Sequence, residues 1–140
     1  MNEQDNAALI KKMYDAFGRG DIQTILDNLA PNVEWVTEGP SIIPYAQKYT
    51  GVDSVRGFFQ ALATTQENHN LTAGEFIAQG DKVATTGRYS AIVKETGKRF
   101  DTAVAHIFTI QNGKVTRFLD FFDTSAVADA YRGTGSAASG

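Results

Sequence analysis

The hydrophobic pattern of this chain changes once along its length, from a helical period to a strand period, and this change limits the folds that it can form. Up to residue 65, apolar residues recur three and four positions apart, as on one face of an α-helix. The three apolar faces are Ile10, Met13, Tyr14 and Phe17; Ile22, Ile25, Leu26 and Leu29; and Val55, Phe58, Phe59 and Leu62. Apolar and polar residues then alternate over 71–78, 82–93, 99–110 and 115–122, which is typical of strands. Helices followed by consecutive strands predict an α+β domain with an antiparallel sheet.

Shorter segments complete the predicted element order. Residues 33–37 alternate like a strand, and residues 39–51 hold two prolines and two glycines and are predicted to form a long loop. Pro31 is expected to end the second helix. Asp123 is predicted to cap a last short helix at 124–131.

Three N-terminal helices are too few to cover one face of four long strands. We therefore expect them to pack on a strongly curved, mostly antiparallel sheet and to enclose a cone-shaped pocket. The domain is expected to span residues 1–132. Residues 133–140 contain only Gly, Ser, Ala and Thr, and are predicted to be disordered because they cannot bury apolar surface.

The composition argues against several classes of function. The 140 residues carry a net charge of -3 and show no basic cluster, so no nucleic-acid partner is expected. There are no cysteines and only two histidines, far apart, so we expect no metal site. Glycine-rich phosphate loops and a serine nucleophile elbow are missing, and no cofactor is expected. A polar N-terminus and the lack of a long apolar run predict no membrane partner and a cytoplasmic location.

The last predicted hairpin carries the candidate chemistry. His106 lies in its first strand and Asp120 in its second, and an ionisable group inside a strand is costly unless it is paired, hydrated or used. We predict that Asp120 is a general base in an apolar pocket and that His106 is its catalytic partner. The alternatives are that Asp120 pairs with Arg117 or Arg88 at the rim of the sheet, and that His106 is a core histidine with a neutral partner.

Aromatic residues are spread over several predicted elements, and we expect them to line the pocket and bind a flat apolar ligand. The predicted ligand-binding residues are Trp35, Tyr14, Phe17, Tyr45, Phe58, Phe59, Tyr89, Phe108, Phe118 and Phe122. Trp35 and Tyr89 are the strongest of these candidates. The alternative is that the same aromatic set forms a plain hydrophobic core.

Three segments in a fixed order carry a family resemblance. They are residues 14–21, at the junction of the first two helices; residues 33–35 followed by 51–59; and residues 106–123, which include Phe121-Phe122-Asp123. In their order and spacing they resemble the NTF2-like superfamily, and within it the SnoaL-like family of polyketide cyclases and ketosteroid isomerase-like proteins. The resemblance covers residues 8–131 and implies the same helix-covered cone.

The resemblance also indicates which of the catalytic residue sets of this superfamily the chain matches. The positions of the ketosteroid isomerase triad are occupied here by Met13, Thr37 and His106, so that triad is missing. The Asp-Arg-Asp set of the limonene-type epoxide hydrolases is incomplete. SnoaL-like cyclases use an aspartate base on the last strand and a histidine on its neighbour, and Asp120 and His106 match both. The resemblance therefore implies a cofactor-independent enzyme with an aspartate base.

The turn of the last hairpin decides whether His106 and Asp120 share a face of the sheet. A two-residue turn at the Asn-Gly dipeptide would pair His106 with Leu119 and place the two candidates on opposite faces. A three-residue loop over residues 111–113 would pair His106 with Phe118 and place them on one face. Local propensity favours the first turn. The resemblance favours the second, and we predict the second.

Three functions fit these observations. The first is an enzyme that performs acid/base chemistry on an apolar carbonyl or polyketide-like substrate. The second is a non-catalytic binder of a hydrophobic metabolite, and the third is a homodimeric interaction module.

A homodimer is expected because the outer face of the sheet is apolar and no predicted helix remains to cover it. Dimers of this kind are common in the resembling families. The residues predicted to form this face are Ala103, Ala105, Ile107, Leu119 and Phe121.

Overall fold

The computed structural model describes residues 2–133 of the chain, so the predicted disordered tail lies outside it except for Gly133. Four helices and six strands confirm the α+β prediction, with one helix after the last strand. Along the chain the elements are α1 (Glu3–Gly18), α2 (Ile22–Asp27), β1 (Leu29–Thr37), β2 (Gln47–Thr50), α3 (Val52–Thr65), β3 (Gln66–Gln79), β4 (Lys82–Val93), β5 (Arg99–Gln111), β6 (Lys114–Phe122) and α4 (Thr124–Tyr131).

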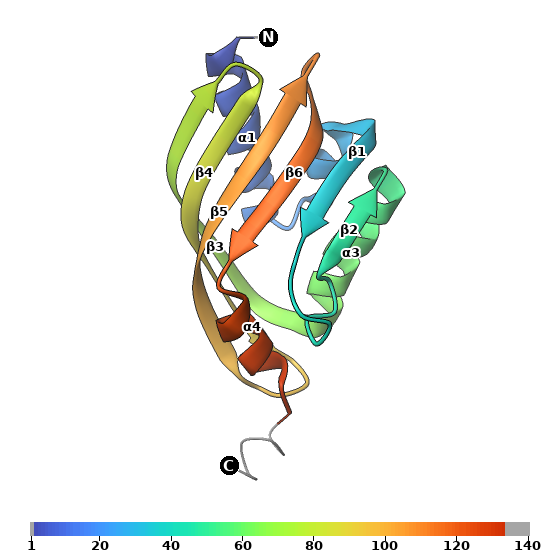
Figure 1. The fold of residues 1–140 in the computed structure, drawn as a ribbon, viewed down its shortest axis with the longest axis vertical. Helices are drawn as coiled ribbons and strands as arrows, with labels where there is room; N and C mark the ends of the chain where they lie inside the picture. The colour runs from blue at the N-terminus through green and yellow to red at the C-terminus, as the bar shows by residue number, and fades with distance from the viewer. Residues whose placement is uncertain (1, 134–140) are drawn as a thin grey trace.

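The six strands form one curved sheet in the order β2-β1-β6-β5-β4-β3. All neighbours are antiparallel except β1 and β6, which run parallel. Helix α1 packs against β3 and β4, and α3 packs against β1 and β2. Figure 1 shows these two helices behind the sheet and α4 at the end where β6 finishes. Because the helices hold opposite edges of the sheet, the inner face of β5 and β6 is free to line a cavity.

The backbones of β3 and β4 come into close contact at Gly87. The register of the two strands shifts between Ala73 and Phe76, beside this position. A Cβ atom placed on Gly87 would lie 2.3 Å from the carbonyl oxygen of Thr72. A glycine is therefore required here for steric reasons, as at other points where one strand approaches another closely.

The prediction for the region around Pro31 was wrong. Helix α2 ends at Asp27, and Pro31 lies inside β1, which begins at Leu29 and pairs with β6. Its missing N–H is tolerated because the pairing of β1 with β6 is irregular between Leu29 and Glu34. The predicted loop at 39–51 also contains a strand, β2, whose short polar sequence gives no alternation to detect. At the other end of the chain, Asp123 caps α4 as predicted, accepting from the Ala126 N–H at 3.2 Å.

The last hairpin has the two-residue turn that we did not predict, and yet it places His106 and Asp120 on one face of the sheet, as we predicted. Asn112 and Gly113 have φ values of 53° and 77°, and the strands close on the pair Gln111–Lys114, so the turn has two residues and the three-residue prediction was wrong. Thr116 is then an extra residue in β6, because the pairing shifts between Ile110–Val115 and Thr109–Arg117. This bulge places His106 directly opposite Asp120, on the same face.

The outer face of the sheet is apolar along β5 and β6, as predicted. Ala105 is paired with Phe121 and Ile107 with Leu119. The Phe121 side chain is 52% exposed, whereas Ile107 and Leu119 are half-buried. In Figure 1, α1 and α3 lie behind the sheet and α4 lies at the end of β6, so no helix runs along the front of β5 and β6.

Replacing Gly87 with alanine is expected to destabilise the fold by about 1–3 kcal/mol, because the new methyl group would overlap the Thr72 carbonyl. Gly57 lies inside α3, and a Cβ atom placed there would meet no atom within 4 Å, so Gly57→Ala is the matched control. That control should raise stability by up to about 1 kcal/mol through helix propensity. Urea unfolding measures both values, and equal stability of the two variants would contradict the steric argument.

Candidate functional site

A row of four polar side chains crosses the inner face of the sheet. Thr85 on β4, His106 on β5, Asp120 on β6 and Thr37 on β1 are direct cross-strand neighbours, each paired with the next. The flanking rows are apolar: Val83, Phe108, Phe118 and Trp35 on one side, and Val104 and Phe122 on the other. The polar row is thus enclosed by hydrophobic side chains within the sheet itself.

Short polar contacts connect this row from end to end. His106 Nε2 lies 3.2 Å from Asp120 Oδ1, and the Thr37 hydroxyl donates to Asp120 Oδ2 at 3.2 Å. On the other side of the ring, His106 Nδ1 lies 2.5 Å from the hydroxyl of Tyr14, which comes from α1. The same Tyr14 hydroxyl lies 2.5 Å from the Thr85 hydroxyl. Tyr14 therefore belongs to the polar row as well as to the predicted ligand-binding set.

The donors and acceptors of this row can be assigned for a neutral histidine. An ionised Asp120 accepts only, so His106 Nε2 must carry the proton that they share. His106 Nδ1 is then an acceptor, and Tyr14 donates to it. Burial raises the pKa of the Tyr14 phenol above its ordinary value; the Thr85 hydrogen bond opposes this, and the Asp120 charge adds to it. Tyr14 thus stays protonated and can donate to Nδ1 in the tautomer that Asp120 favours.

The alternative partners considered for Asp120 are engaged elsewhere. Arg88 pairs with Asp101 at 2.9 Å, and Arg117 lies 3.9 Å from Glu34, with all four side chains well exposed. The side chains of His106 and Asp120 are instead only 10% and 12% exposed. The Asp120 side chain is therefore largely buried and lies between His106 and Thr37.

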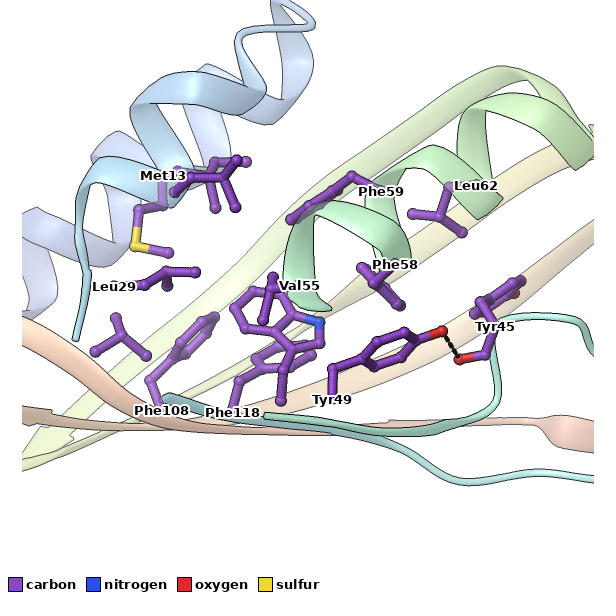
Figure 2. Close-up of a cluster of buried hydrophobic side chains, with 14 of the residues drawn as sticks. Met13, Leu29, Tyr45, Tyr49, Val55, Phe58, Phe59, Leu62, Phe108 and Phe118 are labelled. Atoms are coloured by element: carbon purple, nitrogen blue, oxygen red, sulfur yellow. Dashed lines mark hydrogen bonds between the residues drawn. The ribbon is translucent and has the colours of Figure 1, made fainter. Parts of the chain in front are cut away.

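The polar row opens into a cavity of about 100 Å³. All ten residues predicted to bind ligand lie on its wall, namely Tyr14, Phe17, Trp35, Tyr45, Phe58, Phe59, Tyr89, Phe108, Phe118 and Phe122. Figure 2 shows Phe58, Phe59 and Leu62 of α3 pointing toward Phe108 and Phe118 of the sheet. Contact of these residues with a ligand stays a prediction. Their placement gives the cavity an aromatic wall with Asp120 as its one carboxylate among the described lining residues.

Trp35 lies at the centre of this wall. Its ring stacks on Phe118 with centroids 4.0 Å apart, and it also contacts Phe58 and Phe59. Its buried indole N–H has no hydrogen-bond acceptor among residues 2–133. A buried donor without an acceptor costs about 1–3 kcal/mol, so this N–H is a candidate for a ligand contact.

A second polar cluster lies at the α4 end of the cavity. Gln66, which is 1% exposed, donates through Nε2 to the hydroxyls of Tyr45 at 3.2 Å and Tyr131 at 2.8 Å. Its Oε1 accepts from the Tyr89 hydroxyl at 2.5 Å. Burial raises the pKa of Tyr45 and of Tyr89 above the ordinary value, so both phenols stay protonated.

The sequence analysis did not identify four members of these two clusters. Thr37 and Thr85 face inward because each alternates with outward residues, but a threonine in a strand is too common to indicate a site. Gln66 and Tyr131 come from β3 and α4 and meet only in the folded chain. A buried glutamine leaves no local signal, so this cluster could not have been predicted.

The described part of the chain contains neither a metal-binding cluster nor a helix that could span a membrane. No group of three or more histidine, cysteine or acidic side chains within residues 2–133 could hold a metal ion. Likewise, no helix in this range is long and apolar enough to cross a membrane.

Comparison with known proteins identifies the family. The family model for the SnoaL-like domain matches residues 10–118. The chain belongs to the SnoaL-like family. The structural similarity extends over nearly the whole SnoaL-like domain: an NTF2-like protein from Burkholderia xenovorans LB400 is 29% identical, with 94% of this chain and 99% of the other covered at a TM-score of 0.84.

Two further relatives cover a similar share of the chain. TerC, crystallised with polyporic acid, is 30% identical, with 91% of this chain and 98% of TerC covered at a TM-score of 0.82. An uncharacterized protein of Mycobacterium tuberculosis H37Rv is 23% identical over 131 residues, which are 94% of this chain and 98% of the relative.

Replacing Tyr14 with phenylalanine is expected to leave His106 Nδ1 without a hydrogen-bond donor, while Asp120 still favours the proton on Nε2. Nitrogen-15 NMR of the ring should show the Nε2–H tautomer in both proteins, with the Nδ1 resonance shifted in the variant because its hydrogen bond is lost. Stability should fall by about 1 kcal/mol. Tyr131→Phe, which removes a buried hydroxyl from the other cluster, should leave the His106 signals unchanged. Identical His106 spectra in wild type and Tyr14→Phe would contradict the assignment.

Proposed function

We propose that the protein binds a small, mainly apolar ring compound bearing a carbonyl group, and that Asp120 removes a proton from the carbon beside that carbonyl. The observation that carries the proposal is the largely buried Asp120–His106 pair, 3.2 Å apart, on the wall of an otherwise mainly apolar cavity. A carboxylate surrounded by apolar groups is a suitable general base, since little water competes for the proton.

The polar row supplies each part of this reaction. Asp120 takes the proton, and the electrons of the broken C–H bond form a C=C bond while the carbonyl electrons move to oxygen. The Nε2–H of His106 hydrogen-bonds the developing oxyanion, because a protonated Asp120 accepts that hydrogen bond less strongly. Tyr14 keeps the imidazole ring in place and Thr37 keeps the carboxylate in place.

The size and wall of the cavity support a ring-sized ligand. A cavity of about 150 Å³ in another protein accepts benzene. The present cavity, at about 100 Å³, is of similar size and has aromatic walls. TerC, a relative of 30% identity, was crystallised with polyporic acid, which supports a small-molecule ligand in this branch of the family.

A second candidate function is ligand binding without chemistry. Both oxygens of Asp120 already have a polar partner, since Oδ1 lies 3.2 Å from the His106 ring and Oδ2 accepts from Thr37, and this arrangement also suits a structural carboxylate. The two candidates predict the same ligand class but differ in turnover.

Asp120→Asn is expected to reduce proton abstraction at least about 100-fold while leaving the fold intact, because the amide keeps the shape of the side chain. The measurement is NMR of deuterium uptake at the methyl group of acetophenone in D₂O. Asp101→Asn removes an exposed carboxylate on the same sheet and should leave the rate unchanged. Binding of acetophenone without exchange above background in the wild type would favour the second candidate.

We also propose that two copies of the chain associate through the outer face of β5 and β6. This face combines the exposed ring of Phe121 with the half-buried Ile107 and Leu119. Charges of both signs border it, including Glu34 with Arg117 and, at the other side, Arg88 with Asp101. Two identical faces can therefore meet without net repulsion.

Phe121→Lys is expected to convert a dimer into a monomer, because it places a charge in the centre of the apolar contact. Light scattering at micromolar concentration measures the mass. Lys11→Ala, a change on α1 away from the outer face, is the control and should remain dimeric. A monomeric wild type under these conditions would contradict the proposed association.

A further inference from the structure

Every proton in the cluster around Gln66 can be assigned except one. The two amide protons of Gln66 go to the hydroxyls of Tyr45 and Tyr131, and the Tyr89 proton goes to Gln66 Oε1. Thr65 donates to the carbonyl oxygen of Ala61 at 2.7 Å. The contact of 2.8 Å between Thr65 and Tyr131 must therefore use the Tyr131 proton.

Assigning one proton to each hydrogen bond also fixes the orientation of the Gln66 amide. If its oxygen and nitrogen were exchanged, Tyr131 would have to donate to Gln66. The Thr65 proton would then have to serve both Tyr131 and Ala61, and one contact would lack a proton. Only the observed orientation gives a proton to each of the five contacts.

The proton left over belongs to the Tyr45 hydroxyl. Tyr45 accepts from Gln66, and no described residue accepts from Tyr45. The residue lies on the wall of the cavity, is 4% exposed and packs edge-on against Phe58. Phe58 also contacts Trp35, whose indole N–H likewise has no acceptor among the described residues.

We propose that Tyr45 is a specificity-determining residue whose hydroxyl donates to a second oxygen of the ligand, at the α4 end of the cavity. This inference rests on the proposed function, in which the first oxygen is a carbonyl beside His106 and Asp120. The proposed ligand is then a ring with two acceptor oxygens on opposite sides, rather than a ring with a single acceptor oxygen.

A buried, protonated phenol is well suited to this role. Burial raises the pKa of Tyr45 above its ordinary value, and the charges of Tyr131 and Asp120 act in the same direction. Tyr45 therefore donates a hydrogen bond rather than a proton. A site with a buried donor discriminates against ligands that lack the matching acceptor, because the donor is then left unpaired.

The test compares two probes of similar shape, 1,4-diacetylbenzene with two carbonyls and 4-isopropylacetophenone with one. Tyr45→Phe is expected to weaken binding of 1,4-diacetylbenzene about fivefold and of 4-isopropylacetophenone less than twofold, by calorimetry. Tyr131→Phe is the matched control. It also removes one acceptor of Gln66, but Tyr131 is not on the cavity wall, so both probes should be affected equally.

Other outcomes overturn the inference in distinguishable ways. Equal weakening of both probes by Tyr45→Phe, or no weakening of either, would leave the proposed function standing and remove the role of Tyr45. Failure of both probes to bind the wild type would overturn the proposed ligand class and the inference together.

Infrared spectra of 1,4-diacetylbenzene bound to the wild type provide a measurement that does not depend on a variant. Both carbonyl bands are expected to be shifted by hydrogen bonding. A spectrum of the bound probe in which either carbonyl stays unshifted would overturn the inference.

Discussion

One extra residue in β6, Thr116, determines which residues of that strand face the cavity. Side chains alternate along a strand, so a shift of one residue exchanges the two faces. The Asn112-Gly113 turn alone would direct Asp120 away from His106. The bulge at Thr116 restores the alignment and at the same time turns Phe121 outward. The candidate catalytic pair and the apolar outer face are thus two results of the same local irregularity.

The polar row shows how the fold keeps a carboxylate in an aromatic environment. An isolated buried charge would be very costly, and Asp120 instead has a polar partner on each oxygen, His106 on Oδ1 and Thr37 on Oδ2. One of those partners, His106, is in turn held by Tyr14. In a site with little water these hydrogen bonds are stronger than at the surface and polarise one another. Removal of one member therefore alters the others.

The sequence predicted those features that depend on local pattern. The strand at 82–93 matched its observed bounds, because periodicity determines which side chains share a face. The ten aromatic residues all line the cavity, and those in helices and strands follow the same rule. Features that depend on a distant partner were missed. Neither the short strand β2 nor Pro31 inside β1 has a local signal, since both are stabilised by pairing with other strands. The shared face of His106 and Asp120 was predicted correctly from the wrong turn, because a bulge cannot be read from residue type.

The pairing of β1 with β6 joins parts of the chain that are far apart in sequence, and this affects when the candidate site is assembled during folding. Thr37 and Asp120 are separated by 83 positions, and Tyr14 and His106 by 92, yet each pair is in hydrogen-bond contact. Contacts over such distances in sequence form slowly, because long loops must close first. A nascent chain on the ribosome can complete its three N-terminal helices without any part of the polar row being assembled. The candidate site is therefore complete only when the C-terminal hairpin has docked between β1 and β4.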